Sequence, residues 1–405
     1  MPTTSTTRAA ERVRRIKPSP STSAADRANQ LRREGRSIVN LVVGEPDFDT
    51  PRHVRQAASC AMEQGSTRYT SLAGTPELRQ AIAAKLAREN GLAYDPAEII
   101  VTNGAKSAIY SALAATLEPG DEVVTPAPCW VSYPDMVLVC DGVPVPVACS
   151  EDQGFKLKPE QLAAAITGRT RWLVLNSPSN PTGATYTPDE YRALAAVLAR
   201  HLSVLVMTDD IYEHIWFDGD TAPHLLAAAP KLRDRTLAIN GVSKTYAMTG
   251  WRIGWVAGPR DLVGALDTFL SQAAGNASSV SQAAAVAALS GEQSFVAESV
   301  AIYRERRDAT AAGINGIPGL SCRVPEGAFY LFVNCAGLLG RKTPSGSPLE
   351  TDGDVVLHLL ESVGVAVVAG EGYGLSPYFR LSIATSLDTL WEGVARIARA
   401  VADLR

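Results

Sequence analysis

The 405-residue sequence is poor in aromatic residues, at 6%, and contains only six cysteines and five histidines. The cysteines show no Cys-x-x-Cys spacing and the histidines lack the spacing of metal ligands, which indicates buried free thiols and no metal site. No run of about 18 predominantly apolar residues occurs, so we expect no membrane-spanning helix. A net charge of −4 argues against a nucleic-acid partner, which generally requires a basic surface.

Residues 1–15 are rich in threonine and arginine and contain no apolar segment of the kind that secretory signals carry. A transit peptide has a similar composition, but Glu11 interrupts the arginines, and a flexible bacterial tail is the alternative. With no secretory or membrane segment, the expected location is the cytoplasm.

The length exceeds what one hydrophobic core usually supports and predicts two domains. Apolar runs alternate with amphipathic ones in the middle of the chain, which predicts an α/β fold with a mostly parallel sheet covered by helices. The expected strands are residues 99–103, 121–125, 143–147, 171–176, 203–208, 236–241 and 252–257. Shorter strands near 321–334 and 365–383 suit a smaller α+β domain. We expect an N-terminal arm with part of the small domain at 1–46, a large domain at 47–300 and a small C-terminal domain at 301–405.

Lys244 lies in a segment that combines an amine with groups suited to holding a phosphate. Ser243 can donate a hydroxyl to a phosphate, and Arg252 can supply a charge-assisted pair of hydrogen bonds. The Lys244 amine can form a Schiff base with an aldehyde. Such a short motif also arises by chance, so its meaning depends on the rest of the chain.

Two further polar groups of residues follow apolar runs that read as buried strands. Asn180 lies on a turn after the run at 172–175, and Asp209 and Tyr212 follow the run at 204–207. Ligands bind at the carboxyl ends of strands in open α/β sheets. The pattern therefore predicts that these side chains lie at the rim of the sheet, within reach of a ligand.

Taken together, these segments resemble the fold-type I pyridoxal-phosphate aminotransferases of class I/II, and most closely the bacterial aspartate aminotransferase subgroup. The resemblance covers nearly the whole chain and implies a seven-stranded sheet in the large, cofactor-binding domain. Besides the segments around Asn180, Asp209 and Lys244, it is carried by residues 17–20, 44–51, 69–74, 101–106, 130–134 and 379–384.

The resemblance implies that pyridoxal 5'-phosphate is the cofactor and assigns side chains to its ring. Asp209 matches the carboxylate beside the pyridine nitrogen, where an anion favours the charged ring and makes it a stronger electron sink. Tyr212 and Asn180 would bond the phenolic oxygen and tune the proton affinity of the Lys244 nitrogen. Trp130 matches the aromatic residue that stacks on the ring. The residues alone leave open a helix-capping Asp209 and a Tyr212 that merely packs in the core.

For the phosphate, the resemblance implies the backbone amides of Gly104, Ala105 and Lys106 at a helix N-terminus, because such amides bind anions. Ser243 and Arg252 would complete this cradle. Tyr69 stands in the motif whose tyrosine reaches the phosphate of the partner subunit, so a homodimer is expected.

Substrate recognition is expected to depend on two cations. Arg380 matches the residue that binds the α-carboxylate; a structural salt bridge is the alternative for a buried arginine in this apolar strand. Lys106 matches the residue that reaches the distal carboxylate in the aspartate-directed subgroup; the alternative is a solvated lysine, although the helix dipole disfavours a cation there. The expected substrate-binding residues are Gly44, Lys106, Trp130, Asn180 and Arg380.

We therefore expect transamination between L-aspartate and 2-oxoglutarate with ping-pong kinetics, Lys244 being the catalytic residue, and small amino acids and 2-oxo acids as the binding partners. The subgroup's pattern is altered at Asp210, at Ala369 and in residues 272–276, which leaves the preferred amino acid open. Another donor or acceptor, such as prephenate or a specialised metabolite, is one alternative. A cofactor-dependent lyase or replacement enzyme is another, since a shared fold does not fix the reaction.

Overall fold

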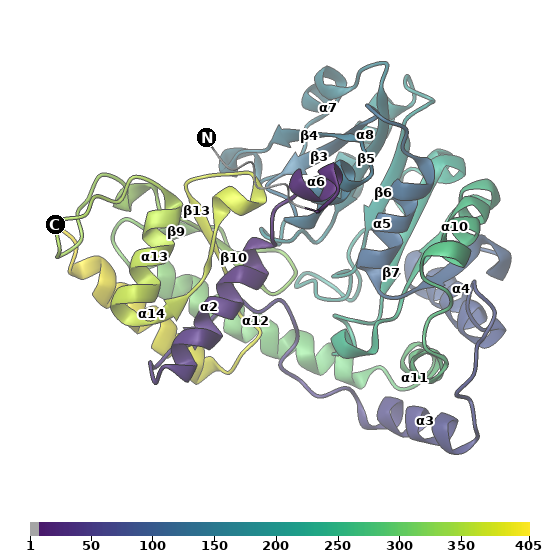
Figure 1. The fold of residues 1–405 in the computed structure, drawn as a ribbon, viewed down its shortest axis with the longest axis horizontal. Helices are drawn as coiled ribbons and strands as arrows, with labels where there is room; N and C mark the ends of the chain where they lie inside the picture. Colours follow the sequence, from purple (N-terminus) through teal and green to yellow (C-terminus); the bar gives the residue numbers. More distant parts are fainter. Residues whose placement is uncertain (1–7) are drawn as a thin grey trace.

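The computed structural model describes residues 8–405, so the first seven residues of the N-terminal stretch considered above as a tail or transit peptide lie outside the described residues. The described part contains two sets of strands, each with its own helices (Figure 1). Among residues 8–405, no helix combines the length and the apolarity that crossing a membrane requires.

The larger sheet has seven strands in the order β2-β8-β7-β6-β5-β3-β4. Neighbouring strands are parallel except at β8, which runs antiparallel to both β2 and β7. This confirms the predicted α/β fold with a mostly parallel seven-stranded sheet. The strands are β2 (Ile99–Thr102), β3 (Glu122–Ala127), β4 (Val143–Ala148), β5 (Thr170–Asn176), β6 (Leu205–Asp209), β7 (Thr236–Gly241) and β8 (Gly254–Ala257).

All seven expected strands exist, but β6 begins two residues later than expected. The start of β8 is also two residues late. The cause is the backbone of Arg252, whose φ of 57° lies in the left-handed region and cannot continue a strand. Arg252 therefore lies on the turn before β8 and not within it.

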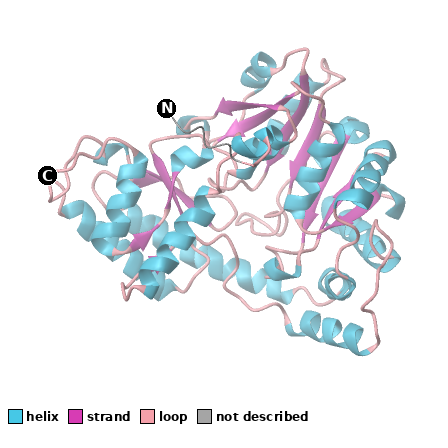
Figure 2. Cartoon of the chain, in the orientation of Figure 1, coloured by secondary structure: helices cyan, strands magenta, loops and turns pink. Residues whose placement is uncertain are grey.

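Helices cover both faces of this sheet (Figure 2). Successive residues of a strand point to opposite faces, so Ile99 and Val101 pack on one side and Ile100 on the other. The first side carries α3 (Arg52–Glu63), α4 (Pro76–Asn90), α7 (Pro159–Ala165), α8 (Pro188–Leu198), α9 (Leu225–Ala228) and α11 (Ser279–Ser290); the second carries α5 (Ala105–Thr116), α6 (Ser132–Val139) and α10 (Arg260–Ala273).

The smaller set of strands includes an antiparallel sheet in the order β12-β13-β10-β9 and the parallel pair β1-β11. Its core also takes residues from three helices, α12 (Ser294–Asn315), α13 (Asp352–Val363) and α14 (Leu387–Ala402). The strands are β1 (Val39–Asn40), β9 (Ser321–Cys322), β10 (Tyr330–Asn334), β11 (Val365–Ala366), β12 (Val368–Ala369) and β13 (Tyr378–Ser382).

The N-terminal segment packs against this second core, because β1 pairs with β11 and α2 (Pro20–Arg33) contacts β11 and β12. Before it lies the short helix α1 (Glu11–Arg14). The expected domain boundary at residue 300 falls within α12, and the division of the chain at 46 and 300 stays a prediction.

Candidate active site

A cavity of about 380 Å³ lies where the ends of β5 and β6 face β10 and β13 of the smaller sheet, a size within the usual range for ligand sites. The cavity wall contains most of the side chains that sequence reasoning selected. The selected residues that line it are Gly44, Ala105, Lys106, Trp130, Asn180, Asp209, Tyr212, Ser243, Lys244, Arg252 and Arg380.

Asp209 ends β6 and is buried, with one carboxylate oxygen bonded and the other free. The hydroxyl of Tyr133 donates to Asp209 Oδ2 at 2.5 Å, whereas Oδ1 has no partner among the described residues. Burial, partly offset by the Tyr133 hydrogen bond, raises the pKa of Asp209 to about 6. An unpartnered, buried carboxylate oxygen facing a cavity fits a ligand that brings its own N–H donor.

Lys244 follows β7 and donates from Nζ to the carbonyl oxygen of Gly44 at 2.6 Å. Burial lowers the pKa of Lys244 to about 8, and the nearby cations Arg252 and Arg380 act in the same direction. A substantial neutral fraction near physiological pH makes this amine a nucleophile and a base.

The N-terminus of α5 forms a concave cradle beside these groups. Gly104 has a φ of 87°, and a Cβ there would lie 2.4 Å from Arg252 Nη2, so the arginine occupies the space that a side chain would fill. A Cβ on Gly254 would lie 2.5 Å from the backbone nitrogen of Ala105. Backbone amides, Arg252 and the nearby Ser243 suit a phosphate in this position.

Arg380 lies on β13, is 3% exposed, and has no carboxylate within ion-pair distance in residues 8–405. Its guanidinium donates to Asn180 Oδ1 at 3.1 Å and to the Val42 carbonyl at 2.5 Å, and its Nε is unpartnered in the same part of the chain. A structural salt bridge is therefore not what holds this cation. Burying a charge is costly without an anion, so the arrangement favours an anionic ligand.

Lys106 occupies the first turn of α5, with its Nζ 4.9 Å from the centre of the Trp130 ring. Partial burial and the neighbouring Arg252 charge lower the pKa of Lys106. Two adjacent cations at a positive helix end favour a bound anion.

Gly104 and Tyr69 are the exceptions among the selected residues. Gly104 directly precedes Ala105 but does not itself line the cavity, and Tyr69 is 97% exposed and does not line it within its own chain.

Sequence reasoning missed several residues that line or support the cavity. Asn176 ends β5 directly opposite Asp209 in the register of the two strands, and its side chain donates to the Asp209 carbonyl at 2.7 Å. Its place at a strand end was a usable signal. For Tyr133 the signal was weaker, namely its position three residues after Trp130. For Tyr330 there was no signal, because this residue lies in an apolar strand typical of a hydrophobic core.

The family model described as aminotransferase class I and II matches residues 36–397. The chain belongs to the class I and II aminotransferases. This confirms the resemblance drawn from the motifs, and with it a pyridoxal-phosphate-dependent aminotransferase.

Relatives of this aminotransferase match it over almost their full lengths. The aspartate aminotransferase of Rhizobium meliloti (strain 1021) is 54% identical over 374 residues, covering 92% of this chain and 91% of that protein. The aspartate/prephenate aminotransferase of Cereibacter sphaeroides is 50% identical over 383 residues, covering 95% and 96%.

Solved structures of aspartate aminotransferases share this fold. The aspartate aminotransferase from Rhizobium meliloti has a TM-score of 0.96 at 52% identity, with 98% of this chain and 100% of that chain covered. The aspartate aminotransferase from Thermus thermophilus with maleate has a TM-score of 0.90 at 39% identity, with coverages of 97% and 99%.

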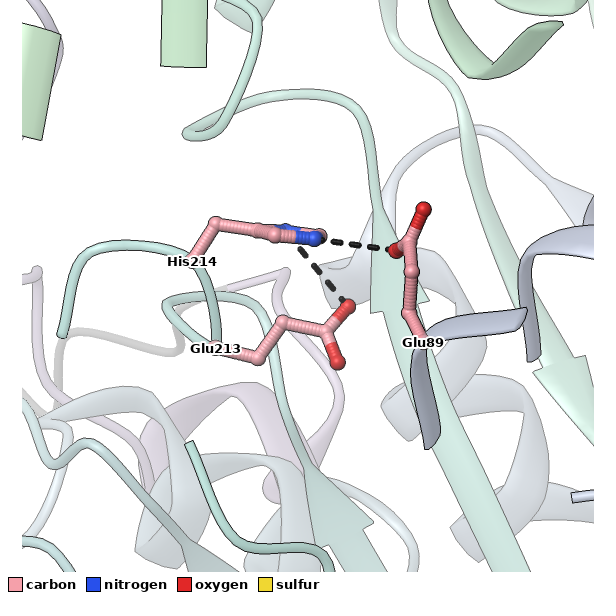
Figure 3. A group of neighbouring side chains, drawn as sticks. All are labelled: Glu89, Glu213 and His214. Carbon is pink, nitrogen blue, oxygen red and sulfur yellow. Dashed lines mark hydrogen bonds and ion pairs between the residues drawn. The ribbon is translucent and has the colours of Figure 1, made fainter. Parts of the chain in front are cut away.

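A second polar cluster of the aminotransferase lies behind the cavity wall and contains Glu89, Glu213 and His214 (Figure 3). Glu213 directly follows Tyr212, and His214 contacts Thr245, the residue after Lys244, at 3.2 Å. The spacing of these three side chains could hold a metal ion, but the Lys85 ammonium already pairs with Glu213 and lies 3.4 Å from Glu89. The Lys85 ammonium in that place repels a metal ion. We therefore interpret the cluster as a structural support for the segments that carry Tyr212 and Lys244.

Burial opposes the ionisation of Glu213, but the charges of Lys85 and His214, with hydrogen bonds from Lys85 and Asn90, outweigh it and lower the pKa of Glu213 to about 2. The Lys85–Glu213 pair therefore contributes its full stabilisation above pH 4.5, the ordinary pKa of a glutamate. This contribution is lost as the pH falls toward 2.

We predict that Lys85→Met lowers the free energy of unfolding at pH 7 by about 3–5 kcal/mol, because it removes the ammonium partner of a buried carboxylate. Urea unfolding of the cofactor-free protein measures this. The double variant Lys85→Met, Glu213→Gln is the control and should recover part of the loss. Equal stability of Lys85→Met and wild type would show that the pair does not support this wall.

Proposed function

We propose that the protein transfers an amino group from L-aspartate to 2-oxoglutarate in two half-reactions. The observation that carries this proposal is Arg380, a buried guanidinium without a carboxylate partner in residues 8–405, in one cavity with Lys244 and Lys106. The arginine suits the α-carboxylate of an amino acid, because its planar fork can bind a carboxylate through two hydrogen bonds. Lys106 suits the second carboxylate of aspartate, glutamate and their 2-oxo acids.

When bound, pyridoxal phosphate supplies an aldehyde that accepts the amino group and a ring that withdraws electrons. Lys244 would hold the aldehyde through Nζ until the substrate amine replaces it. The released amine, with its pKa lowered to about 8, would then move a proton from the substrate Cα. Asp209 would pair its free Oδ1 with the ring nitrogen.

The remaining groups would fix the position of the ligand. Ser243, Arg252 and the amides of residues 104–106 would hold the phosphate, and Trp130 would lie on the ring face. Asn180 and Tyr212 would donate to the phenolic oxygen of the cofactor. The side-chain oxygen of Asn180 already accepts from Arg380, so its NH₂ group is the one that would donate. Gly44, whose carbonyl accepts from Lys244, would leave room for the substrate.

Dicarboxylate recognition gains support from the relatives. Maleate, named with the Thermus thermophilus aspartate aminotransferase, carries two carboxylates, as aspartate does. Several relatives at 45–50% identity are named aspartate/prephenate aminotransferases. Prephenate also carries two carboxylates, so the same two cations would suit it, and it is our second candidate acceptor.

We predict that L-aspartate alone converts the bound cofactor to its amine form, and that 2-oxoglutarate then restores the aldehyde form. Absorbance of the purified holoenzyme follows both steps, with prephenate as the second acceptor. In Lys106→Met, kcat/KM for aspartate should fall about 10–100-fold, the loss of one charge-assisted hydrogen bond.

L-Alanine, which lacks the distal carboxylate, is the matched control for Lys106→Met, and its kcat/KM should change little. A cofactor spectrum that aspartate leaves unaltered would reject the proposed donor. Equal losses for both amino acids would reject the role of Lys106.

We propose further that the active unit is a homodimer in which Tyr69 reaches the phosphate of the partner subunit. Its support is the exposure of Tyr69 outside its own cavity, together with the motif that contains it. The cytoplasmic location stays a prediction.

Hybrid dimers test the role of Tyr69. Lys244→Ala and Tyr69→Phe homodimers should each have low activity. A mixed dimer has one site that combines the native Lys244 of one chain with the native Tyr69 of the other, so mixing after reversible dissociation should restore up to about a quarter to half of wild-type activity per subunit. Activity of the mixture no higher than the mean of its two parents would contradict a shared site.

A further inference from the structure

Tyr330 contacts three residues of the proposed active site, although it comes from the smaller antiparallel sheet. Its hydroxyl lies 2.9 Å from that of Tyr212, and the Arg380 guanidinium lies 4.3 Å from its ring centre. A Cβ on Gly44 would lie 2.7 Å from the same hydroxyl oxygen. Tyr330 is 1% exposed, so its hydroxyl has little freedom to bond elsewhere.

The two tyrosine hydroxyls share one hydrogen bond, and its direction matters for the ligand. If Tyr212 donates to Tyr330, the Tyr212 proton is no longer available to a ligand oxygen in the cavity. If Tyr330 donates, Tyr212 keeps its own proton for the ligand, and the accepted bond polarises Tyr212 into a stronger donor.

The surroundings favour Tyr330 as the donor. A cation over an aromatic face stabilises negative charge on that ring and makes its hydroxyl the more acidic of the two. Burial raises the pKa of both tyrosines, and for Tyr330 the Arg380 charge is the largest cause that opposes this rise. For Tyr212 burial and the neighbouring Tyr330 oxygen hold the pKa well above its usual range.

We propose that Tyr330 is a positioning residue: it donates its hydroxyl proton to Tyr212, so that Tyr212 directs its own proton to the phenolic oxygen of the bound cofactor. This inference rests on the proposed function, which places that oxygen beside Tyr212. A stronger donor withdraws negative charge from the phenolic oxygen and makes the neighbouring Lys244 nitrogen a weaker base.

The titratable and charged groups that face the tyrosine pair come from six places: Arg380 on β13, Asp209 on β6, Tyr133 on α6, Lys244 after β7, Tyr303 on α12 and Tyr373 on the short helix η6 (Gly370–Tyr373). Arg380 is the cation over the Tyr330 ring. A substrate carboxylate bound to Arg380 offsets its charge, weakens the Tyr330 donor and raises the proton affinity of the Lys244 nitrogen. The two tyrosines thereby link the binding of the substrate carboxylate to the proton affinity of the Lys244 nitrogen, which the substrate amine must replace.

The test is the pH titration of cofactor absorbance in the holoenzyme without substrate, which reports the proton on the Lys244 nitrogen. Tyr330→Phe should raise the midpoint by about 0.2–0.5 pH unit, because polarisation by one neighbouring bond is a fraction of a charge-assisted hydrogen bond. Tyr212→Phe should raise it by about 1 unit, since the whole donor is lost. In the Tyr212→Phe background, Tyr330→Phe should have no further effect.

Tyr373→Phe is the matched control, because Tyr373 is equally buried and faces the same guanidinium at 5.3 Å, but its hydroxyl lies 3.3 Å from Ser21 and does not contact Tyr212. Its midpoint should equal that of wild type. Thermal melting of each variant shows whether the fold is retained.

An unchanged or lowered midpoint in Tyr330→Phe would overturn the proposal, and a lowered one would mean that Tyr212 is the donor. Equal shifts with and without the Tyr212 hydroxyl would also overturn it. Because the titration uses no substrate, it is separate from the aspartate half-reaction, whose failure in the wild type would reject the proposed function instead.

Discussion

The site depends on one constraint: two oppositely charged side chains are buried in one cavity without the partners that would neutralise them. Asp209 has an unbonded carboxylate oxygen, and Arg380 has no ion-pair partner, in the described part of the chain. Each is oriented by neutral or weakly polar neighbours, Tyr133 for Asp209 and Asn180 with the Val42 carbonyl for Arg380. Such groups reduce the stability of the ligand-free protein. We propose that they are retained because the bound cofactor supplies a ring N–H to Asp209 and the substrate supplies a carboxylate to Arg380.

The fold explains how these charges come to lie together without pairing. Asp209 is at the carboxyl end of β6, in the parallel sheet, whereas Arg380 is in the middle of β13, in the antiparallel sheet. The N-terminal segment with Gly44 lies between Lys244 and Tyr330, contacting one by a hydrogen bond and the other by close packing. Behind the wall, Lys85 and Glu213 tie α4 to the segment that carries Tyr212. The candidate active site thus lies between two hydrophobic cores, and its shape depends on the packing of both.

Much of the fold and of the candidate site was predictable from the sequence, and the reasons differ among residues. The seven strands were readable because each is an apolar run bounded by polar turns, and Asn180 and Asp209 were readable because they lie within a few residues of the end of such a run. Lys244, Ser243 and Arg252 lie within one short segment, and the family motif made their grouping evident. Tyr330 could not be found, because a tyrosine in an apolar strand gives no sign that its hydroxyl reaches across to another sheet. The late start of β8 depended on the left-handed backbone of Arg252, which residue type alone does not predict. The contact of Tyr69 with a partner subunit, implied by its motif, stays a prediction.

The most direct test of the central claim compares the cofactor-free stability of wild type and Asp209→Asn across pH. Because burial raises the pKa of Asp209 from 3.8 to about 6, ionisation of the folded protein is penalised as the pH rises through this interval, and the full penalty remains above it. The account predicts that cofactor-free Asp209→Asn is more stable than wild type at pH 7, by about 1–3 kcal/mol, and that the difference vanishes below about pH 4. Pyridoxal phosphate should then stabilise wild type more than the variant. If Asp209→Asn is instead the less stable protein at pH 7 without cofactor, the carboxylate supports the fold and the claim is contradicted.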